Sequence, residues 1–554
     1  MTGAQILIES LKREGVEVVF GYPGGQVLPI FDKFYDSDLK LILVRHEQGA
    51  AHAADGYARA TGKVGVCLAT SGPGATNLTT GIANAYMDSI PMVAITGQVK
   101  SFLIGNDAFQ EADVTGITRP ITKHNYLVKD IKDLARIIRE AFYIASTGRP
   151  GPVVIDIPSD IQMQDAEFIW PKDIKMRSYQ PTYCGHPGQI KKAAKLIMQA
   201  KKPLVYSGGG IISSGADAIL REFAEKISAP VTWTLMGIGG FPATHKLSLG
   251  MLGMHGTAYA NHAIMDADVI IAVGARFDDR VTGRTDTFAP NAKIIHIDID
   301  PSSISKNIRV DVPIVGDAKN ILGELLEQIK KCPDTADWLK SVDILKKKYP
   351  LKYKEDKKLK PQFVLEELYD ITKGDCVITT EVGQNQMWAA QWYKYDEPRT
   401  FISSGGLGTL GFGFPAAMGA KVGRPDKTVI DIAGDGSIQM NIQELGTCVA
   451  NKINVKVFIL NNGYLGMVRQ WQELFYKKRY SHVAISSPDF VKLAESYGAA
   501  GILVTKKEEV RPAIERALST DNTVFVDFRI EEEENVYPMV PAGEAINKMI
   551  EGLA

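Results

Sequence analysis

Short runs of Val, Ile and Ala alternate with helical patterns along almost the whole chain, in three successive segments. Such alternation predicts parallel strands that are buried on both faces and joined by helical crossovers. The segments cover residues 1–165, 185–325 and 362–540. Because 554 residues are too many for one hydrophobic core, we expect an α/β protein with three domains. Each domain should be a mostly parallel sheet flanked by helices.

The expected strands are short and strongly apolar. The candidates are 18–20, 41–44, 65–69, 92–95 and 153–157 in the first segment, 203–206, 229–232, 269–273 and 293–297 in the second, and 376–379, 428–433, 455–460 and 524–527 in the third. Two polar stretches, 162–186 and the Lys-rich 346–360, separate the segments. The Lys-rich stretch is more simply a solvated linker than a nucleic-acid arm.

Composition excludes several classes of protein. The formal net charge is −1, so nothing indicates a nucleic-acid or membrane partner. No apolar run reaches the roughly 18 residues that span a bilayer, and the amphipathic N-terminus lacks the features of a signal or transit peptide. The five cysteines are scattered without a CxxC pair. We therefore expect a cytoplasmic protein with inert thiols, without a zinc site or a disulfide framework.

Polar residues follow two expected strands of the third segment. Gly434, Asp435 and Gly436 come directly after 428–433, and Asn462 follows 455–460. Open α/β sheets bind ligands at the carboxyl ends of their strands. Mg²⁺ prefers carboxylate and amide oxygens combined with phosphate oxygens. Taken separately, each of these polar clusters could be an ordinary turn. Their occurrence together at the ends of two strands favours a site for magnesium and a diphosphate.

Glycine-rich turns follow other strands. The stretch 71–77 (SGPGATN) opens a helix whose N-terminus favours an anion, although a tight turn alone would look the same. Gly406, Gly408 and Gly411 match the dinucleotide spacing, but only a weak strand precedes them. A loop lining another ligand is the better interpretation. The glycines 208–210, directly after 203–206, are a better nucleotide-phosphate candidate.

Charged and aromatic side chains near strand ends complete the candidate set. Glu47 follows the strand 41–44, and taken alone it would most simply cap a helix. Arg276 and Arg280 follow 269–273, where an arginine could bind a carboxylate or phosphate bidentately. Trp471, nine residues after the asparagine pair, is either a core tryptophan or a wall of the diphosphate pocket.

Longer strings resemble one known family. GDG…NN is the diphosphate–metal signature of thiamine diphosphate enzymes. The strings RHEQGAAHAADGYAR, TSGPGATN, MLGMHGTAYAN, GARFDDRVTG and NNGYLGMVRQWQE together resemble the catalytic large subunit of biosynthetic acetohydroxyacid synthase, also called acetolactate synthase. The resemblance runs from about residue 1 to 545.

The resemblance implies a thiamine diphosphate site built from the first and third segments. Glu47 would hydrogen-bond N1′ of the aminopyrimidine, while Phe109 and Gln110 would line the substrate end. Magnesium would be bound by Asp435, Asn462 and the backbone oxygen of Tyr464. The other cofactor contacts would be Gln384, Asn385, Gly408, Thr409, Leu410, Gly434, Gly436 and Ser437.

The middle segment would bind FAD without a Rossmann fingerprint. The matching contacts are Gly208, Gly209, Thr234, Leu235, Leu252, Met254, His255, Gly274, Arg276, Asp278, Asp298, Ile299, Asp317 and Ala318. Arg280 and Trp471 match the residues that bind the second 2-oxoacid.

The implied activity is acetolactate synthesis in branched-chain amino acid biosynthesis. Pyruvate is decarboxylated, and its two-carbon unit is joined to a second pyruvate or to 2-oxobutyrate, giving 2-acetolactate or 2-aceto-2-hydroxybutyrate. Thiamine diphosphate carries the carbanion, and FAD has no net redox task. A homodimer or homotetramer is also implied, together with a separate regulatory small subunit.

Three other functions remain open at this stage. A simple 2-oxoacid decarboxylase is disfavoured because the chain has no adjacent histidines. A pyruvate oxidase would use FAD for electron transfer, which the RFDDRVTG and Trp471 context disfavours. A non-enzymatic nucleotide-binding scaffold conflicts with the joint presence of Glu47, Asp435 and Asn462.

Overall fold

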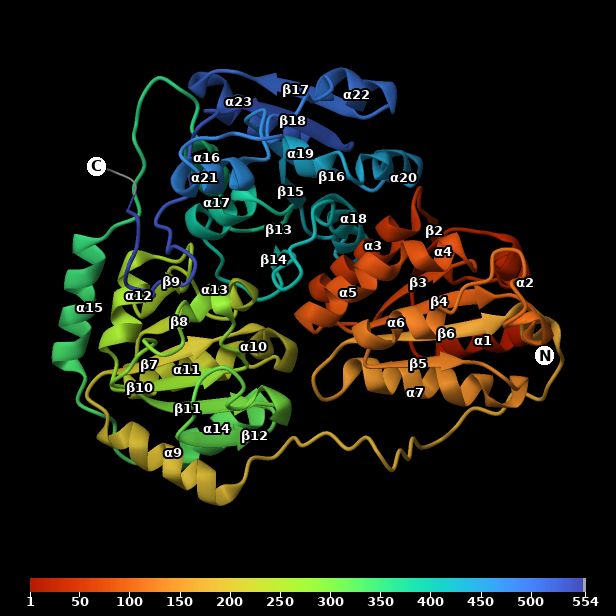
Figure 1. Ribbon diagram of the computed structural model, residues 1–554, viewed down its shortest axis with the longest axis horizontal. Helices are drawn as coiled ribbons and strands as arrows, with labels where there is room; N and C mark the ends of the chain where they lie inside the picture. Colours follow the sequence, from red (N-terminus) through yellow and green to blue (C-terminus); the bar gives the residue numbers. More distant parts are fainter. Residues whose placement is uncertain (552–554) are drawn as a thin grey trace.

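Three parallel sheets, each with six strands, organise the computed structural model, which describes residues 1–551. Every strand pairing among these residues is parallel. The first sheet lies at the right of Figure 1, the second at the lower left and the third at the top. The predicted α/β fold with three helix-flanked parallel sheets is confirmed.

The first sheet has the strand order β2-β1-β3-β4-β6-β5. Its strands are β1 (Val18–Gly21), β2 (Lys40–Leu43), β3 (Gly65–Ala69), β4 (Met92–Gln98), β5 (His124–Leu127) and β6 (Pro152–Pro158). Its helices are α1 (Gly3–Arg13), α2 (Leu28–Tyr35), α3 (Glu47–Thr61), α4 (Pro73–Asn77), α5 (Thr79–Asp88), α6 (Val114–Thr118), α7 (Leu134–Ser146) and α8 (Ser159–Met163). Two separate hydrophobic clusters cover its two faces, so β3, β4 and β6 are wholly buried.

The second sheet has the order β12-β11-β10-β7-β8-β9. Its strands are β7 (Pro203–Ser207), β8 (Val231–Trp233), β9 (Ser248–Met251), β10 (Val269–Val273), β11 (Lys293–Asp298) and β12 (Val312–Val315). The helices here are α9 (Pro187–Gln199), α10 (Gly209–Ser214), α11 (Asp217–Ile227), α12 (Ala258–Asp266), α13 (Asp279–Thr282), α14 (Ala318–Gln328) and α15 (Ala336–Lys348).

The third sheet has the order β14-β13-β15-β16-β18-β17. Its strands are β13 (Val377–Thr380), β14 (Phe401–Ile402), β15 (Val429–Gly434), β16 (Val455–Asn461), β17 (Ala500–Val504) and β18 (Val524–Arg529). Its helices are α16 (Pro361–Thr372), α17 (Gln384–Trp392), α18 (Gly413–Gly423), α19 (Asp435–Ile438), α20 (Leu445–Ala450), α21 (Gly466–Phe475), α22 (Phe490–Ser496) and α23 (Val510–Ser519).

Long connections join the three sheets. Residues 164–186 run from α8 to α9 along the outside of the molecule (Figure 1). Tyr179 fixes this connection, because its hydroxyl donates to the carbonyl of Thr147 at 2.6 Å. The Lys-rich stretch was expected to be a linker from residue 346, but α15 continues to Lys348. Lysines favour the last turn of a helix, where they complement its dipole.

Helices α3 and α18 join the first sheet to the third. Helix α3 has His46 as its N-cap, whose Nδ1 accepts from the amide of Gln48 at 3.1 Å, and Gly62 with φ +78° as its C-cap. A Cβ atom at Gly419 of α18 would overlap the carbonyl oxygen of Ala53. The two backbones therefore approach more closely than ordinary side chains would allow. No helix among residues 1–551 is long and apolar enough to cross a membrane.

Candidate functional site

Each sheet reverses its strand order at one point, where ligands of such folds usually bind. In the second sheet this point lies between β7 and β10. The amide of Gly208 donates to Val273 at 2.9 Å, and the amide of Gly210 donates to Gly274 at 3.1 Å. A Cβ atom at Gly208 would overlap the carbonyl oxygen of Gly274. The glycines after β7 thus let two strand ends lie against each other.

A cavity of about 1020 Å³ opens at this point. Its volume is at the upper end of the range for ligand pockets, and it is large enough for a dinucleotide. All the residues predicted to contact FAD line it except Gly208. Those lining it are Gly209, Thr234, Leu235, Leu252, Met254, His255, Gly274, Arg276, Asp278, Asp298, Ile299, Asp317 and Ala318.

Several polar groups in the cavity have unused hydrogen-bonding capacity. Oδ1 of Asp278 and Nδ1 of His255 are buried, and neither has a partner among the described residues. Burial lowers the pKa of His255 to about 4, so its imidazole is neutral at pH 7. Burial also raises the pKa of Asp298 to about 6. Because unpaired buried polar atoms are costly, this lining fits a large polar ligand such as FAD.

Arg280 and Trp471 lie on the same cavity wall as the FAD-type residues. The side chain of Arg280 is 62% exposed, and its nearest carboxylate, on Asp279, is 3.9 Å away. Its guanidinium is therefore available to bind an anion. Trp471 is half-buried on α21 and packs against Phe475 with ring centroids 5.3 Å apart. The two side chains predicted to bind the second 2-oxoacid thus face one space.

The third sheet reverses its order between β13 and β15, and Asp435 follows β15 directly. Oδ2 of Asp435 accepts from Ser487 at 3.1 Å, whereas Oδ1 is buried without a partner in the described part of the chain. Burial raises the pKa of this carboxyl to about 6. Asn462 lies close by on the loop after β16, and its Oδ1 accepts from the amide of Tyr464 at 3.1 Å. The unpaired carboxylate oxygen and the neighbouring amide fit a hard cation such as Mg²⁺.

Gln384 and Asn385, which begin α17, connect to this magnesium-type site. Oε1 of Gln384 accepts from Asn462 at 3.2 Å. The Asn385 side chain donates to the carbonyls of Glu381 at 3.0 Å and Ile432 at 2.8 Å. Gly434 and Ser437 close the turn after β15, where the Ser437 hydroxyl donates to the Gly434 carbonyl at 3.2 Å. The structure brings these predicted residues together, with Gly436 in the same turn.

The loop Gly408–Leu410 forms the next part of the site. Gly408 has φ +71°, a conformation that favours glycine. The amide of Thr409 donates to Ser404 at 2.8 Å, and its hydroxyl donates to Asn84 of α5 at 3.1 Å. Leu410 is half-buried. Gly408 also lines the large cavity, so this glycine-rich loop does face a ligand space, as expected.

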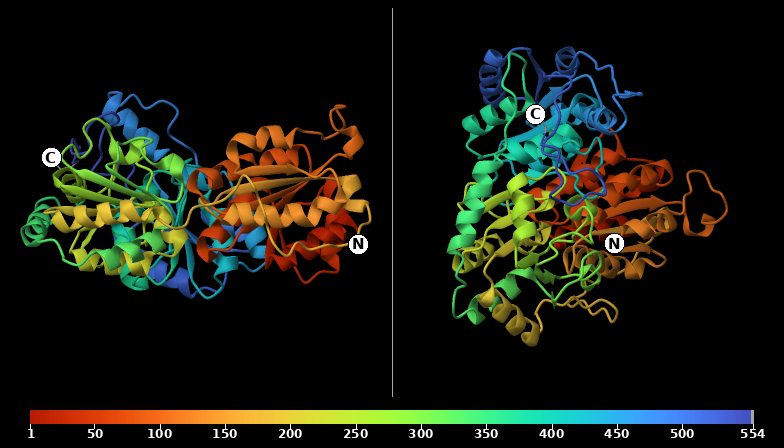
Figure 2. Two further views of the ribbon diagram at one scale, coloured as in Figure 1. Left: turned by 90° about the horizontal axis from the view of Figure 1, so that it is seen from below. Right: turned by 60° about the vertical axis from the view of Figure 1, so that its left-hand side comes forward.

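Glu47 is the first residue of α3, and a different set of residues surrounds it. Asn77 donates to its carboxylate at 2.9 Å. A Cβ atom at Gly74 would lie 3.3 Å from Oε1 of Glu47, and one at Gly72 would lie 2.8 Å from the Gln110 carbonyl. Glu47 and Gln110 therefore lie near the same turn. Phe109 is 84% exposed, on a segment after β4 that projects from the first domain (Figure 2).

Glu47 and Asp435 lie in different domains and make no direct contact among the described residues, although the start of α3 touches the third domain through Glu444, whose Oε1 accepts from the amide of His46 at 3.0 Å. Among the described residues, no hydrogen bond joins Glu47 to Asp435, Asn462 or Gln384, and neither Glu47 nor Asp435 lines the large cavity. Residues 1–551 hold no cluster of three His, Cys, Asp or Glu side chains suited to a metal. A magnesium ion there would need ligand oxygens in addition to those of the protein.

Family models match all three domains. The thiamine pyrophosphate enzyme N-terminal TPP binding domain matches residues 1–117, the central domain matches 190–325, and the C-terminal TPP binding domain matches 381–528. The acetolactate synthase large subunit of Buchnera aphidicola (from Schizaphis graminum) is 54% identical and covers 99% of this chain and 98% of its own. The chain belongs to the acetolactate synthase large-subunit family of thiamine pyrophosphate enzymes.

Two other members of the acetolactate synthase large-subunit family are similarly close. The acetolactate synthase large subunit of Haemophilus influenzae is 52% identical, and the acetolactate synthase isozyme 3 large subunit of Escherichia coli K12 is 50% identical. Each alignment covers 99% of this chain and 98% of the relative. The similarity therefore extends over all three domains.

Some contacts in this thiamine pyrophosphate enzyme were not predicted from the sequence. The stretch 71–77 suggested an anion site, but its last residue, Asn77, binds the Glu47 carboxylate instead. Glu381 was not singled out, although its carbonyl accepts from Asn385. A carboxylate directly after a buried strand, three residues before Gln384, was the available signal.

Proposed function

We propose that this chain is the catalytic subunit of an acetolactate synthase. It decarboxylates pyruvate and joins the two-carbon unit to a second pyruvate or to 2-oxobutyrate. The products are 2-acetolactate and 2-aceto-2-hydroxybutyrate, precursors of the branched-chain amino acids. Thiamine diphosphate, Mg²⁺ and FAD are its cofactors.

The shared cavity wall of Arg280 and Trp471 carries this proposal. The cavity next to the cofactor loops is lined by the exposed guanidinium of Arg280, 3.9 Å from the Asp279 carboxylate, and by Trp471. A 2-oxoacid has a carboxylate and a short apolar chain, so one side chain suits each end of the acceptor. A simple decarboxylase would need a proton-donating side chain at this place, and it would not need a binding site for a second 2-oxoacid.

The residues of the chain divide the remaining tasks. Asp435, Asn462 and the Tyr464 carbonyl would hold Mg²⁺ against the diphosphate. Glu47, held by Asn77 at 2.9 Å, would carry a proton at N1′ of the aminopyrimidine. Leu410 would keep the pyrimidine and thiazolium rings close together. When bound, thiamine diphosphate supplies the carbanion that no side chain can supply.

Reconstitution of the purified protein tests the function. Pyruvate with thiamine diphosphate, Mg²⁺ and FAD should yield 2-acetolactate, and added 2-oxobutyrate should also yield 2-aceto-2-hydroxybutyrate. Acetaldehyde as the main product would favour a decarboxylase, and consumption of oxygen or a quinone with acetate formation would favour an oxidase. If the protein bound its cofactors but did not turn over pyruvate, the result would favour a non-enzymatic nucleotide-binding scaffold.

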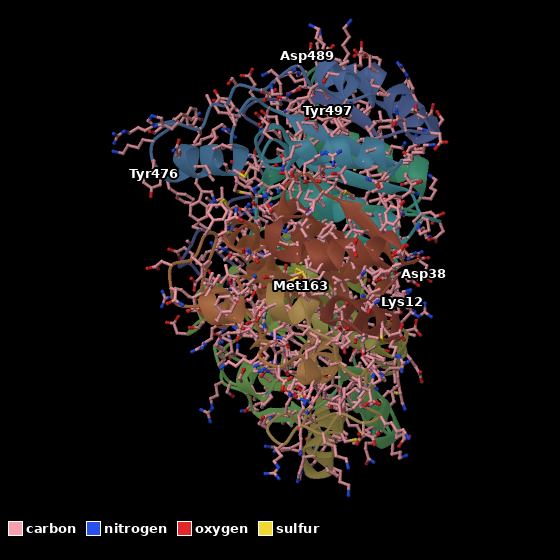
Figure 3. All side chains as sticks on the ribbon, turned by 90° about the vertical axis from the view of Figure 1, so that its right-hand side faces the viewer. Lys12, Asp38, Met163, Tyr476, Asp489 and Tyr497 are labelled. Carbon is pink, nitrogen blue, oxygen red and sulfur yellow. The ribbon has the colours of Figure 1, made fainter. Side chains whose placement is uncertain are left out.

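A dimer is the smallest assembly that this function requires. Glu47 and Asp435 occupy separate places in one chain, so the complete site would combine the first domain of one subunit with the third domain of another. Phe102 and Phe109 are 69% and 84% exposed, and Tyr476 is 63% exposed. Tyr476 lies at the edge of the face where the first and third domains adjoin (Figure 3). Exposed aromatic residues are typical of interfaces.

Assembly and location complete the proposal. The named relatives are large subunits, so this chain would act with a separate regulatory small subunit. The subunits would form a homodimer or a homotetramer of the catalytic chain, located in the cytoplasm.

A further inference from the structure

Glu381, directly after β13, is a fully buried carboxylate that none of the proposed roles uses. Its Oε2 accepts from the amide of Gly411 at 2.7 Å, and its Oε1 accepts from the amide of Phe414 at 3.1 Å. Phe414 lies in the first turn of α18. The carboxylate therefore binds both the end of the Gly408–Gly411 loop and the positive end of a helix.

The backbone of Glu381 is fixed just as firmly. Its amide donates to the carbonyl of Ile432 at 3.1 Å, and its carbonyl accepts from the Asn385 side chain at 3.0 Å. Asn385 and the loop after Gly408 belong to two different parts of the chain that contact the cofactor in the proposed function. One residue thus connects them.

We propose that Glu381 is a positioning residue for thiamine diphosphate, which holds the Gly408–Gly411 loop at the correct distance from Gln384 and Asn385. This inference rests on the proposed function and extends it to a residue that would not touch the cofactor. The loop carries Leu410, so a loosened loop would let the two cofactor rings move apart.

A second buried carboxyl lies beside the first and provides a control. Oδ1 of Asp431 accepts from the hydroxyl of Thr379 at 3.0 Å, while Oδ2 has no partner in the described chain. Burial, and then the neighbouring carboxyl of Glu381, raise the pKa of Asp431 well above its usual range. Asp431 makes no hydrogen bond to the loop amides.

Titration calorimetry of thiamine diphosphate into the Mg²⁺- and FAD-loaded protein tests the inference. Glu381→Gln keeps the shape but turns an NH₂ group toward Gly411 or Phe414, so a donor faces a donor. The dissociation constant should rise by about 10-fold or more, the size expected when a buried hydrogen bond is lost and its donor is left without an acceptor. Asp431→Asn should change it by less than about twofold, because Asp431 makes no hydrogen bond to the loop amides and the amide keeps the shape of the carboxyl.

Turnover separates positioning from general damage. Glu381→Gln should raise the apparent KM for thiamine diphosphate more than it lowers kcat at saturating cofactor, with FAD content unchanged. Glu381→Asp keeps a carboxyl group on a shorter side chain, so its apparent KM for thiamine diphosphate should lie between those of the wild-type protein and Glu381→Gln. Wild-type affinity in Glu381→Gln, or an equal loss in Asp431→Asn, would overturn the inference.

Hydrogen exchange in the wild-type protein covers the case in which Glu381→Gln does not fold. The amides of Gly411 and Phe414 should be strongly protected even without thiamine diphosphate, because Glu381 already binds them. Rapid exchange of both would contradict the proposed role. A wild-type protein that bound no thiamine diphosphate would instead reject the proposed function, so the two failures are distinguishable.

Discussion

Trp471 presents an aromatic face to the cavity beside Arg280. We expect its indole to contact the extra methyl group of 2-oxobutyrate. One methylene in an apolar pocket is worth about 1–3 kcal/mol, or roughly 5- to 150-fold in selectivity. Trp471→Leu should therefore move the product ratio toward 2-acetolactate when pyruvate and 2-oxobutyrate compete. Trp392, a half-buried tryptophan at the end of α17 that does not line the cavity, provides the control. If Trp471→Leu gave the wild-type product ratio, as Trp392→Leu should, the proposed contact between the Trp471 indole and 2-oxobutyrate would be wrong.

Arg280 has a matched control four residues further along. Its guanidinium makes a long ion pair with Asp279 at 3.9 Å, whereas Arg284, which does not line the cavity, forms a close pair with Asp286 at 2.6 Å. Arg280→Ala should raise the apparent KM for the acceptor acid by about 10-fold or more, because one charged hydrogen bond is worth about 1.5–3 kcal/mol. Arg284→Ala should leave that KM unchanged. Steady-state kinetics with varied 2-oxobutyrate would measure both, and an unaltered KM in Arg280→Ala would exclude carboxylate binding there.

For single residues, the sequence predicts which side chains lie near strand ends better than it predicts what each of them contacts. Asp435 and Asn462 were predicted as neighbours because both follow buried strands, and in the structure the backbone of Asn462 does lie next to the Asp435 carboxyl. Gly208 was predicted as an FAD contact; it packs against Gly274 and does not line the cavity, so its contact with FAD stays a prediction. A glycine that allows two backbones to meet and a glycine that approaches a ligand leave the same signal in a sequence. The roles of the site residues themselves stay predictions.

At the scale of elements, the contact between α3 and α18 depends on glycine, which has no side chain to hold the two helices apart. A Cβ atom at Gly419 would overlap the Ala53 carbonyl, which belongs to a rigid helix backbone. Gly419→Ala should lower stability by about 1–3 kcal/mol, the usual cost of overpacking. Gly323 in α14 has an open environment, with its nearest neighbour 3.5 Å away. Gly323→Ala should leave stability unchanged or raise it, since Ala favours helix.

Thermal unfolding of the cofactor-loaded protein would compare these two variants. The midpoint should fall for Gly419→Ala and not for Gly323→Ala. Equal midpoints in both variants would mean that the two helices can separate without cost, contrary to the close approach of their backbones.

The strands that were not predicted share one property. The sequence candidates did not include β5, β9, β12, β14 or β17, and each of these is an edge strand. Edge strands are covered less completely, so their sequences are less apolar: β5 is not fully buried at any position, and β9 and β12 are buried only at alternate positions. The central strands were found because burial on both faces demands continuous apolar runs.

On the scale of the whole molecule, charged groups fix how the domains meet. Arg59 of α3 pairs with Asp55 at 2.5 Å and Asp88 at 2.9 Å, and it donates to the Ser403 carbonyl of the third domain at 2.8 Å. Asp88 in turn accepts from the amide of Gly406 at 2.7 Å. No local pattern predicts such a contact, because its partners lie more than 300 residues apart in the chain. The domain boundaries proposed from the sequence likewise remain predictions.

Neither Glu47 nor Asp435 lines the large cavity, and no hydrogen bond joins them among the described residues, so a mixed assembly tests whether they act in one site across two subunits. Glu47→Gln and Asp435→Ala should each inactivate the enzyme alone. If every site combines the first domain of one subunit with the third domain of another, a mixed dimer has one site with both changes and one intact site. Because random pairing makes half of the dimers mixed, co-expression should restore about a quarter of wild-type acetolactate synthesis. If both residues acted within one chain, every site would carry one defect and co-expression would restore nothing.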